Sequence, residues 1–209
     1  MTGEGVATRA PLLGEPLPVE LMNTIAVIDS GIHDALADDD EAAGWLRAVG
    51  GRIATEAGAD PDLTGDGLRR SLESLRELRD ALRRLAAEMT ADPRPPAAGP
   101  APTRPEAIAT LNALARARPE VVWPAGGQPA RSYRAGNLAV ALIAVQAVEL
   151  FTGRARERLR PCLAPNCLLF FAKDHGRREW CSPACGNRAR VARHYRRHHP
   201  SPHHGEQAQ

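Results

Sequence analysis

The chain has 209 residues, of which 43% are hydrophobic and 25% are charged, and its formal net charge is +2 at pH 7. This length fits one domain of about 150 residues and a small module. The charge is uneven, because residues 1–153 hold 15 arginines and 21 acidic residues, net −6, whereas residues 154–199 hold 12 basic and 3 acidic residues, net +9. Nucleic acid is therefore the expected partner of the basic part, and the acidic part is not expected to share that contact.

Two features bear on secretion and membranes. Residues 1–16 lack the basic and then apolar pattern of a signal peptide. The most apolar stretch, Leu138 to Phe151, is 14 residues long and contains Gln146 and Glu149, whereas a helix that spans a bilayer needs about 20 residues. We therefore expect a cytoplasmic protein without a membrane partner, in which residues 137–153 form a buried helix.

The first predicted elements are two short helices. The apolar residues 17–28 predict a short helix after a turn rather than a strand, because the segment contains Pro18 and Asn23. The acidic run at 38–40 can cap the next helix, which is expected to have about ten residues and to end near Gly50.

Residues 63–90 show the most regular pattern in the chain. Leucine or methionine recurs every three or four residues, with arginine and glutamate between them. The apolar positions are Leu68, Leu72, Leu75, Leu78, Leu82, Leu85 and Met89. This stripe predicts an amphipathic helix. Its leucines either pack into the core or form the coiled-coil seam of a homodimer.

Residues 91–105 are rich in proline and alanine and predict a flexible linker that packs little. Thr103 can cap a following helix that ends before Pro119. The pair Gly126–Gly127 lies between two runs with β-forming residues and predicts a hairpin. Residues 1–153 are therefore expected to form a helical domain with a small β-hairpin, so that the fold class is mainly α.

The four cysteines of the chain form two close pairs. Cys162 and Cys167 have the spacing Cys-x4-Cys, and Cys181 and Cys185 follow with the spacing Cys-x3-Cys. Thiolates are the ligands of tetrahedral structural zinc, and two such pairs let two turns meet at one ion. Two disulfides are the alternative, which the paired spacing and a reducing cytosol disfavour. We therefore expect all four cysteines to bind one structural Zn²⁺.

The residues around the cysteines predict a small zinc-dependent module over 154–199. Pro165–Asn166 favours a tight turn at the first pair. Residues 168–171 and 179–181 are expected to form a hairpin, and Ser182 is expected to cap a C-terminal helix. A turn, a hairpin and a helix around one metal make a treble-clef-like four-cysteine zinc finger, which zinc must hold together.

The C-terminal helix of this module carries the candidate contacts with nucleic acid. At about 100° per residue, it has a basic side, on which Gly186 leaves the backbone open, and a packed side with Val191 and Tyr195. Arg188 is expected to support the finger or the neighbouring domain rather than to contact a ligand. The expected nucleic-acid-binding residues are Arg177, Arg178, Arg190, Arg193 and Arg197. A solvated helix face is the alternative interpretation.

Several of these residues resemble a known family. They are the cysteine pairs, Phe170–Phe171, the run REWCS at 178–182 and the run CGNRARV at 185–191. Together they resemble the CGNR zinc finger, and the preceding region resembles the ABATE domain that usually accompanies it, most clearly in GEPLPVELMNT at 14–24. The resemblance implies a stress-induced bacterial transcription regulator rather than an enzyme. It also implies a finger that binds nucleic acid, with DNA favoured over RNA, and a helical domain that senses a signal or dimerises.

The same residues bear on other classes of function. A zinc hydrolase needs an open coordination position, which four cysteines close. A redox-sensitive regulator remains an alternative, because cysteines beside cations have lowered pKa values. A regulator that binds RNA is a further alternative. An adaptor that binds a protein partner through Phe170, Phe171 and Trp180 is another, although these rings are also expected as the core of the finger. The sequence identifies no effector, and residues 200–209 predict a disordered tail.

Overall fold

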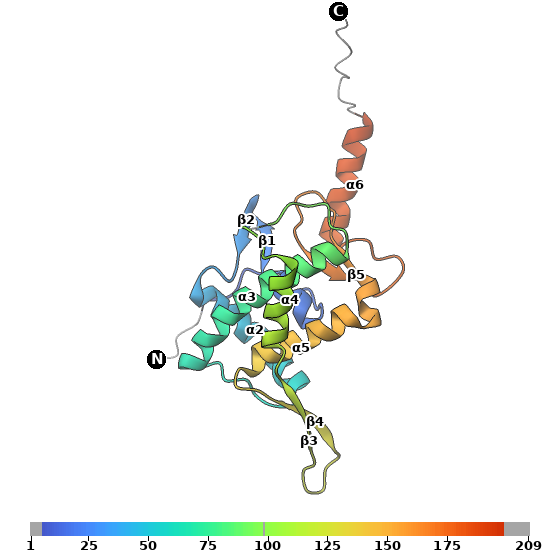
Figure 1. Cartoon of the computed structure of the whole chain (residues 1–209). Helices are drawn as coiled ribbons and strands as arrows, with labels where there is room; N and C mark the ends of the chain where they lie inside the picture. The colour runs from blue at the N-terminus through green and yellow to red at the C-terminus, as the bar shows by residue number, and fades with distance from the viewer. Residues whose placement is uncertain (1–5, 98, 199–209) are drawn as a thin grey trace, which may run out of the picture.

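The computed structural model describes residues 6–97 and 99–198 and shows a mainly helical chain (Figure 1). The helices are α1 (Leu17–Met22), α2 (Asp39–Ala57), α3 (Gly65–Met89), α4 (Arg104–Leu114), α5 (Leu138–Thr152), the 3-10 helix η1 (Arg154–Arg158) and α6 (Pro183–His198). The strands are β1 (Ile25–Ile28), β2 (Gly31–Asp34), β3 (Arg118–Val122), β4 (Ala130–Arg134), β5 (Leu159–Pro161) and β6 (Phe170–Ala172). They form the antiparallel pairs β1–β2, β3–β4 and β5–β6. The predicted mainly α class with small hairpins is confirmed.

Within the described ranges, no helix combines the length and the apolar character needed to cross a membrane. The tail predicted at 200–209 lies outside the described residues.

The core of the helical domain lies between α1, α3, α4 and α5. Helix α3 packs against the other three, and α2 packs against α3 and α5. The leucine stripe of α3 faces this core, because Leu72, Leu75, Leu78 and Leu82 are at most 4% exposed. These leucines are buried within their own chain, so they do not form the coiled-coil seam that the sequence left open.

Helix α2 is longer than the sequence indicated. It begins as predicted, with the Asp38 carboxylate accepting a hydrogen bond from the Glu41 amide at 2.9 Å. It then continues through Gly50 and ends at Gly58, whose φ of 63° lies in the left-handed region. Gly50 lies inside the helix, and its missing side chain leaves room for Leu63, whose methyl carbon is 3.1 Å from where a Cβ would stand. The predicted end near Gly50 is therefore wrong, since tertiary packing decides the role of this glycine.

A hairpin that the sequence did not predict follows α1. Strands β1 and β2 pair with Ile28 opposite Gly31, which leaves Asp29 and Ser30 as a two-residue turn. Both turn residues have positive φ values, 50° and 68°, as the turns that match strand twist require. The helix predicted over 17–28 is thus confirmed for α1 and wrong for β1. The usual signal for such a turn is Asn-Gly or Asp-Gly, which Asp29-Ser30 does not match.

Helix α4 and the following hairpin form as predicted. The Thr103 hydroxyl faces the Glu106 amide, and the Glu106 carboxylate accepts a hydrogen bond from the Thr103 amide at 2.8 Å. The two residues thereby close a capping box at the start of α4. Gly126 supplies the positive φ, 75°, in the loop between β3 and β4. Figure 1 shows this hairpin projecting from the body at the opposite end from α6.

The linker after α3 packs more than predicted at its first residues. Asp92 and Arg94 form an ion pair at 2.6 Å. The Arg94 guanidinium also donates to three backbone carbonyls of the finger, those of Cys162 at 3.2 Å, Cys167 at 2.9 Å and Leu169 at 3.3 Å. The expectation that the linker packs little is wrong here, because Arg94 satisfies carbonyls of the turn that carries the first cysteine pair.

The helical domain and the C-terminal module share their core. Leu159 and Phe170 of the module are at most 1% exposed and belong to the main hydrophobic cluster of the helical domain. Conversely, Ala26 belongs to the cluster around the four cysteines. The buried Asn23 amide donates to the Phe170 carbonyl at 2.9 Å and accepts from the Phe170 amide at 2.8 Å. The two regions of opposite charge therefore form one packed body.

Glu20 is a buried carboxyl group in α1 and gives the fold a pH dependence. It accepts hydrogen bonds from the amides of Leu13 at 3.0 Å and Glu15 at 2.8 Å. Burial raises the pKa of Glu20 above its ordinary 4.5, although these amides and Arg52 oppose the shift. Because the folded-state pKa is the higher one, the stabilising contribution of Glu20 is fully present below the unfolded-state pKa and is lost as pH rises through the folded-state value.

We therefore expect the wild type to lose stability relative to Glu20→Gln as the pH rises from about 4 to about 7. Glutamine keeps an acceptor for the two amides but cannot ionise. Urea denaturation of both proteins at several pH values measures the difference in unfolding free energy. A difference that stays constant over this range would contradict the assignment.

Candidate metal centre and nucleic-acid interface

Four cysteine sulfurs gather at one point of the described chain. The Sγ atoms of Cys162, Cys167, Cys181 and Cys185 all lie within 4.8 Å of one another, and all four residues are buried. The Sγ atom of Cys167 lies 3.8 Å from that of Cys181 and 3.7 Å from that of Cys185. A tetrahedral zinc with Zn–S bonds of about 2.3 Å places its sulfurs about 3.8 Å apart. The set therefore fits one Zn²⁺, and the distances are far too long for disulfides of about 2.05 Å.

The charge of the site also favours a bound cation. The neighbouring sulfurs of Cys162 and Cys167 raise the pKa of the Cys181 thiol, and the Cys162 sulfur raises that of Cys167 to about 12. Thiols packed this closely resist ionisation together unless a metal ion compensates the charge. Four protein ligands fill a tetrahedral zinc, so its role is structural. Arg188 donates from Nη2 to the Cys185 sulfur at 3.0 Å, which agrees with the supporting role predicted for it.

The first cysteine pair lies at the tip of a hairpin, but not the predicted one. Strand β5 pairs with β6, and the Cys162 amide donates to the Leu169 carbonyl at 2.9 Å to close the loop between them. Asn166 has a φ of 55°, which provides the tight turn expected here. The predicted pairing of 168–171 with 179–181 is wrong. The partner of β6 is β5, which precedes the cysteines, and 179–181 form no strand.

The second cysteine pair opens α6. The Ser182 hydroxyl accepts a hydrogen bond from the Cys185 amide at 3.3 Å, so the predicted cap is confirmed. Cys185 lies in the first turn of α6, so the start of the helix fixes the position of its sulfur. A turn, the β5–β6 hairpin and α6 surround one metal, and this arrangement confirms the treble-clef-like finger.

The aromatic residues of the finger serve its own packing. Phe170 and Phe171 are each 1% exposed. The indole of Trp180 lies 3.1 Å from where a Cβ of Gly186 would stand, so Trp180 covers this glycine. The predicted open backbone at Gly186 is therefore wrong. The two phenylalanines are likewise buried, which removes them as anchors for a partner protein.

Four of the five predicted arginines are exposed. They are Arg177, Arg190, Arg193 and Arg197. The last three lie on α6, which extends away from the body in Figure 1. Because α6 projects in this way, Val191 and Tyr195 are 69% and 63% exposed, and the prediction that they pack is wrong. The helix therefore presents basic and apolar groups to solvent around most of its circumference.

Arg178 has an internal role instead of the predicted contact with nucleic acid. Its guanidinium donates to the carbonyls of Ala172 at 3.1 Å and Cys181 at 3.0 Å and forms an ion pair with the buried Glu15. It also lies over the Phe171 ring, 5.1 Å from the centroid. These contacts join the finger to the helical domain, so Arg178 is not carried into the proposed interface.

Residues far from the cysteines in sequence hold the finger, and the sequence did not predict them. Asn23 pairs with the backbone of Phe170, and Arg94 binds the carbonyls of the turn with the first cysteine pair. Arg83 donates to the carbonyls of Met22 at 2.6 Å and Leu168 at 3.2 Å, one on each side of the junction. The one sequence feature that could have indicated these contacts is the polar Asn23 directly after an apolar helix.

Two family models match the chain. The ABATE model, described as "Putative stress-induced transcription regulator", matches residues 15–154, and the CGNR zinc finger matches residues 158–198. No curated protein matches the chain. The first match spans most of the sequence, and the second contains the four cysteines that surround the metal position. The chain belongs to the ABATE family, and it carries a CGNR zinc finger with one structural zinc.

Proposed function

We propose that the protein is a cytoplasmic transcription regulator that binds DNA through the exposed arginines of α6. The observation that carries this proposal is a basic helix that begins at a zinc ligand and projects beyond the body (Figure 1). Zinc fixes the first turn of the helix, and the rest of it is open to a large polyanion. The family description, which concerns transcription regulation, supports a regulator rather than an enzyme.

The charges favour contacts with phosphate. Residues 154–199 carry a net charge of +9, whereas residues 1–153 carry −6. Arg193 and Arg197 lie four residues apart on α6 and are exposed, so they can contact successive phosphates along one strand. The major groove of DNA, about 12 Å wide, admits an α-helix. Exposed Val191 and Tyr195 supply apolar groups beside the arginines, which suits contact with bases.

The helical domain would control the position of α6 by sensing a signal or by dimerising. The structural basis is the packed junction, in which Asn23, Arg83 and Arg94 bind the backbone of the finger. A change in the helical domain would reach the metal site through these residues. RNA is the second candidate ligand, since the same arginines bind the phosphates of either polymer.

The test compares the zinc-loaded wild type with an Arg190→Ala, Arg193→Ala, Arg197→Ala triple variant. We expect the triple variant to bind random duplex DNA at least about tenfold more weakly at low salt. The slope of log K against log salt should become shallower by about 0.9 for each phosphate that the variant no longer binds. Titrations with duplex DNA, single-stranded DNA and structured RNA at two salt concentrations measure both quantities.

The matched control removes three exposed arginines elsewhere, with Arg47→Ala, Arg70→Ala and Arg118→Ala. It has the same net charge as the test variant. Equal binding by the wild type and the α6 variant would remove the proposed interface. Equal weakening in both variants would show that net charge, and not α6, sets the affinity. Tighter binding to structured RNA than to duplex DNA would favour the second candidate.

A further inference from the structure

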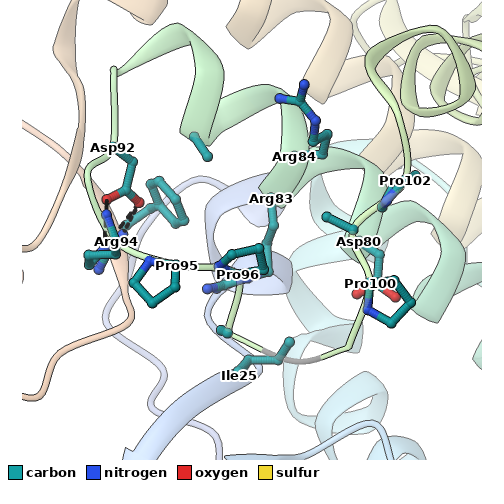
Figure 2. Close-up of a pocket in the computed structure, with 14 residues that line it drawn as sticks. Ile25, Asp80, Arg83, Arg84, Asp92, Arg94, Pro95, Pro96, Pro100 and Pro102 are labelled. Atoms are coloured by element: carbon teal, nitrogen blue, oxygen red, sulfur yellow. Dashed lines mark hydrogen bonds and ion pairs between the residues drawn. The ribbon is translucent and has the colours of Figure 1, made fainter.

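A cavity of about 260 Å³ lies between α3, the proline-rich linker and the finger. Its apolar wall includes Ile25 of β1, Ala87 of α3 and Phe170 of β6, together with proline rings of the linker. Figure 2 shows Arg83 and Asp80 projecting from α3 toward the linker, which carries Pro95 and Pro96 across this face. The volume is slightly below the range of about 300–1,000 Å³ found for drug-sized ligands. The cavity therefore suits a smaller molecule.

The charges in this cavity are not balanced. Asp92 pairs with Arg94 at 2.6 Å, and Asp80 pairs with Arg79 at 2.9 Å, so both acidic groups of the wall already have cationic partners. Arg83 donates to two backbone carbonyls, and among residues 6–97 and 99–198 no carboxylate lies within 4.0 Å of its guanidinium. Its remaining N–H groups have no such acceptor. A partly buried cation without a carboxylate partner is costly, so an anion in the cavity would be stabilised.

The electrostatics around Arg83 also favour an anion in the cavity. Burial lowers the pKa of Arg83 to about 10, and the cations Arg94 and Arg79 contribute to the lowering, whereas Asp80 and Asp92 oppose it in part. The group thus stays charged at neutral pH in a place that disfavours positive charge. An anionic ligand would relieve both effects.

We propose that this cavity binds a small amphipathic monocarboxylate, with its carboxylate on Arg83 and its apolar part against Phe170, Ile25 and the linker prolines. The apolar wall disfavours a purely inorganic anion, and Arg83 disfavours a neutral ligand. This assignment stands independently of nucleic-acid binding.

A ligand here would touch the groups that hold the metal-binding turn. Arg83 and Arg94 both lie over the Phe170 ring, with their guanidinium carbons 5.4 Å and 5.0 Å from its centroid. Arg94 also binds the carbonyls of Cys162 and Cys167. A ligand in this cavity would therefore contact the junction between the helical domain and the zinc finger.

The test uses the zinc-loaded full-length chain with benzoate as the probe, benzamide as its neutral isostere and inorganic phosphate as a plain anion. We expect benzoate to bind with a dissociation constant of about 1 mM or lower in calorimetric titration. Benzamide and phosphate should each bind at least about tenfold more weakly. Saturation-transfer NMR on the same samples checks that benzoate contacts the protein.

Two variants test whether benzoate binds in this cavity. Arg83→Met removes the cation, and Ala87→Leu fills the cavity while keeping every arginine; each should weaken benzoate binding at least about tenfold. Arg70→Met, on the exposed side of the same helix, is the matched control and should bind like the wild type. If Arg83→Met does not fold, Ala87→Leu decides alone. The proposal is overturned by absence of saturable benzoate binding, by equal binding of benzamide or phosphate, or by unchanged binding to Ala87→Leu.

Discussion

Loss of zinc is expected to unfold the finger and to destabilise the helical domain with it. In Cys181→Ser one of the four ligands is gone, and zinc contributes about 10–16 kcal/mol to folding in small zinc-finger peptides. That exceeds what the buried apolar surface of the finger can supply. Leu159 and Phe170 would then leave the main core, which we expect to cost about 3–5 kcal/mol. The melting temperature of the helical domain should fall by roughly 6–20 °C.

Hydrogen exchange measured by mass spectrometry, together with a thermal melt, checks this expectation. Amides of the finger should exchange freely in Cys181→Ser, and amides of α3 and α5 should be less protected than in the wild type. Ala184→Ser is the matched control, since it introduces the same hydroxyl at an exposed position of the same turn. Treatment of the wild type with a chelator should reproduce the Cys181→Ser result. Full protection of α3 and α5 after zinc removal would show that the two parts fold independently.

Asn23→Ala is expected to be strongly destabilising although the side chain is far from the cysteines in sequence. The Asn23 amide satisfies both the amide and the carbonyl of Phe170, and it is 0% exposed. Alanine would leave two buried backbone groups without partners, at about 1–3 kcal/mol for each. Because these two hydrogen bonds join the end of α1 to β6, exchange should increase on both sides of the junction.

Chemical denaturation gives the unfolding free energy for this comparison. Asn112→Ala is the matched control, because Asn112 is exposed on α4. Its replacement should change the stability by less than about 0.5 kcal/mol. Similar stabilities of Asn23→Ala and Asn112→Ala would show that the Asn23 bonds do not stabilise the junction. Faster exchange confined to the finger would show that the bonds support the finger alone.

The metal site was the part of the molecule most open to prediction from sequence. The spacing of Cys162, Cys167, Cys181 and Cys185 implied four thiolates around one ion, and their sulfurs do lie within 4.8 Å. Ser182 marked the start of α6, and Thr103 marked the start of α4, because helix caps depend on a few neighbouring residues.

Predictions from the sequence failed where contacts between distant segments determine the local structure. Strand β5, and not residues 179–181, pairs with β6, because a strand of three residues carries too little pattern to specify its partner. Gly50 continues α2, and Leu63, which lies outside this helix, packs against it. The Asp29–Ser30 turn of β1–β2 lacks the usual residues, although its backbone takes the expected positive φ values.

The arginines show what the sequence determines and what only the tertiary structure determines. Sequence alone determined that positive charge concentrates in residues 154–199 and that zinc organises this region. It could not separate Arg178, whose charge is compensated by Glu15, from Arg190, Arg193 and Arg197 on the exposed helix. Nor could it show that Arg83 and Arg94 meet at Phe170. Local chemistry depends on neighbouring residues, whereas burial and ion pairing depend on residues that meet only when the chain folds.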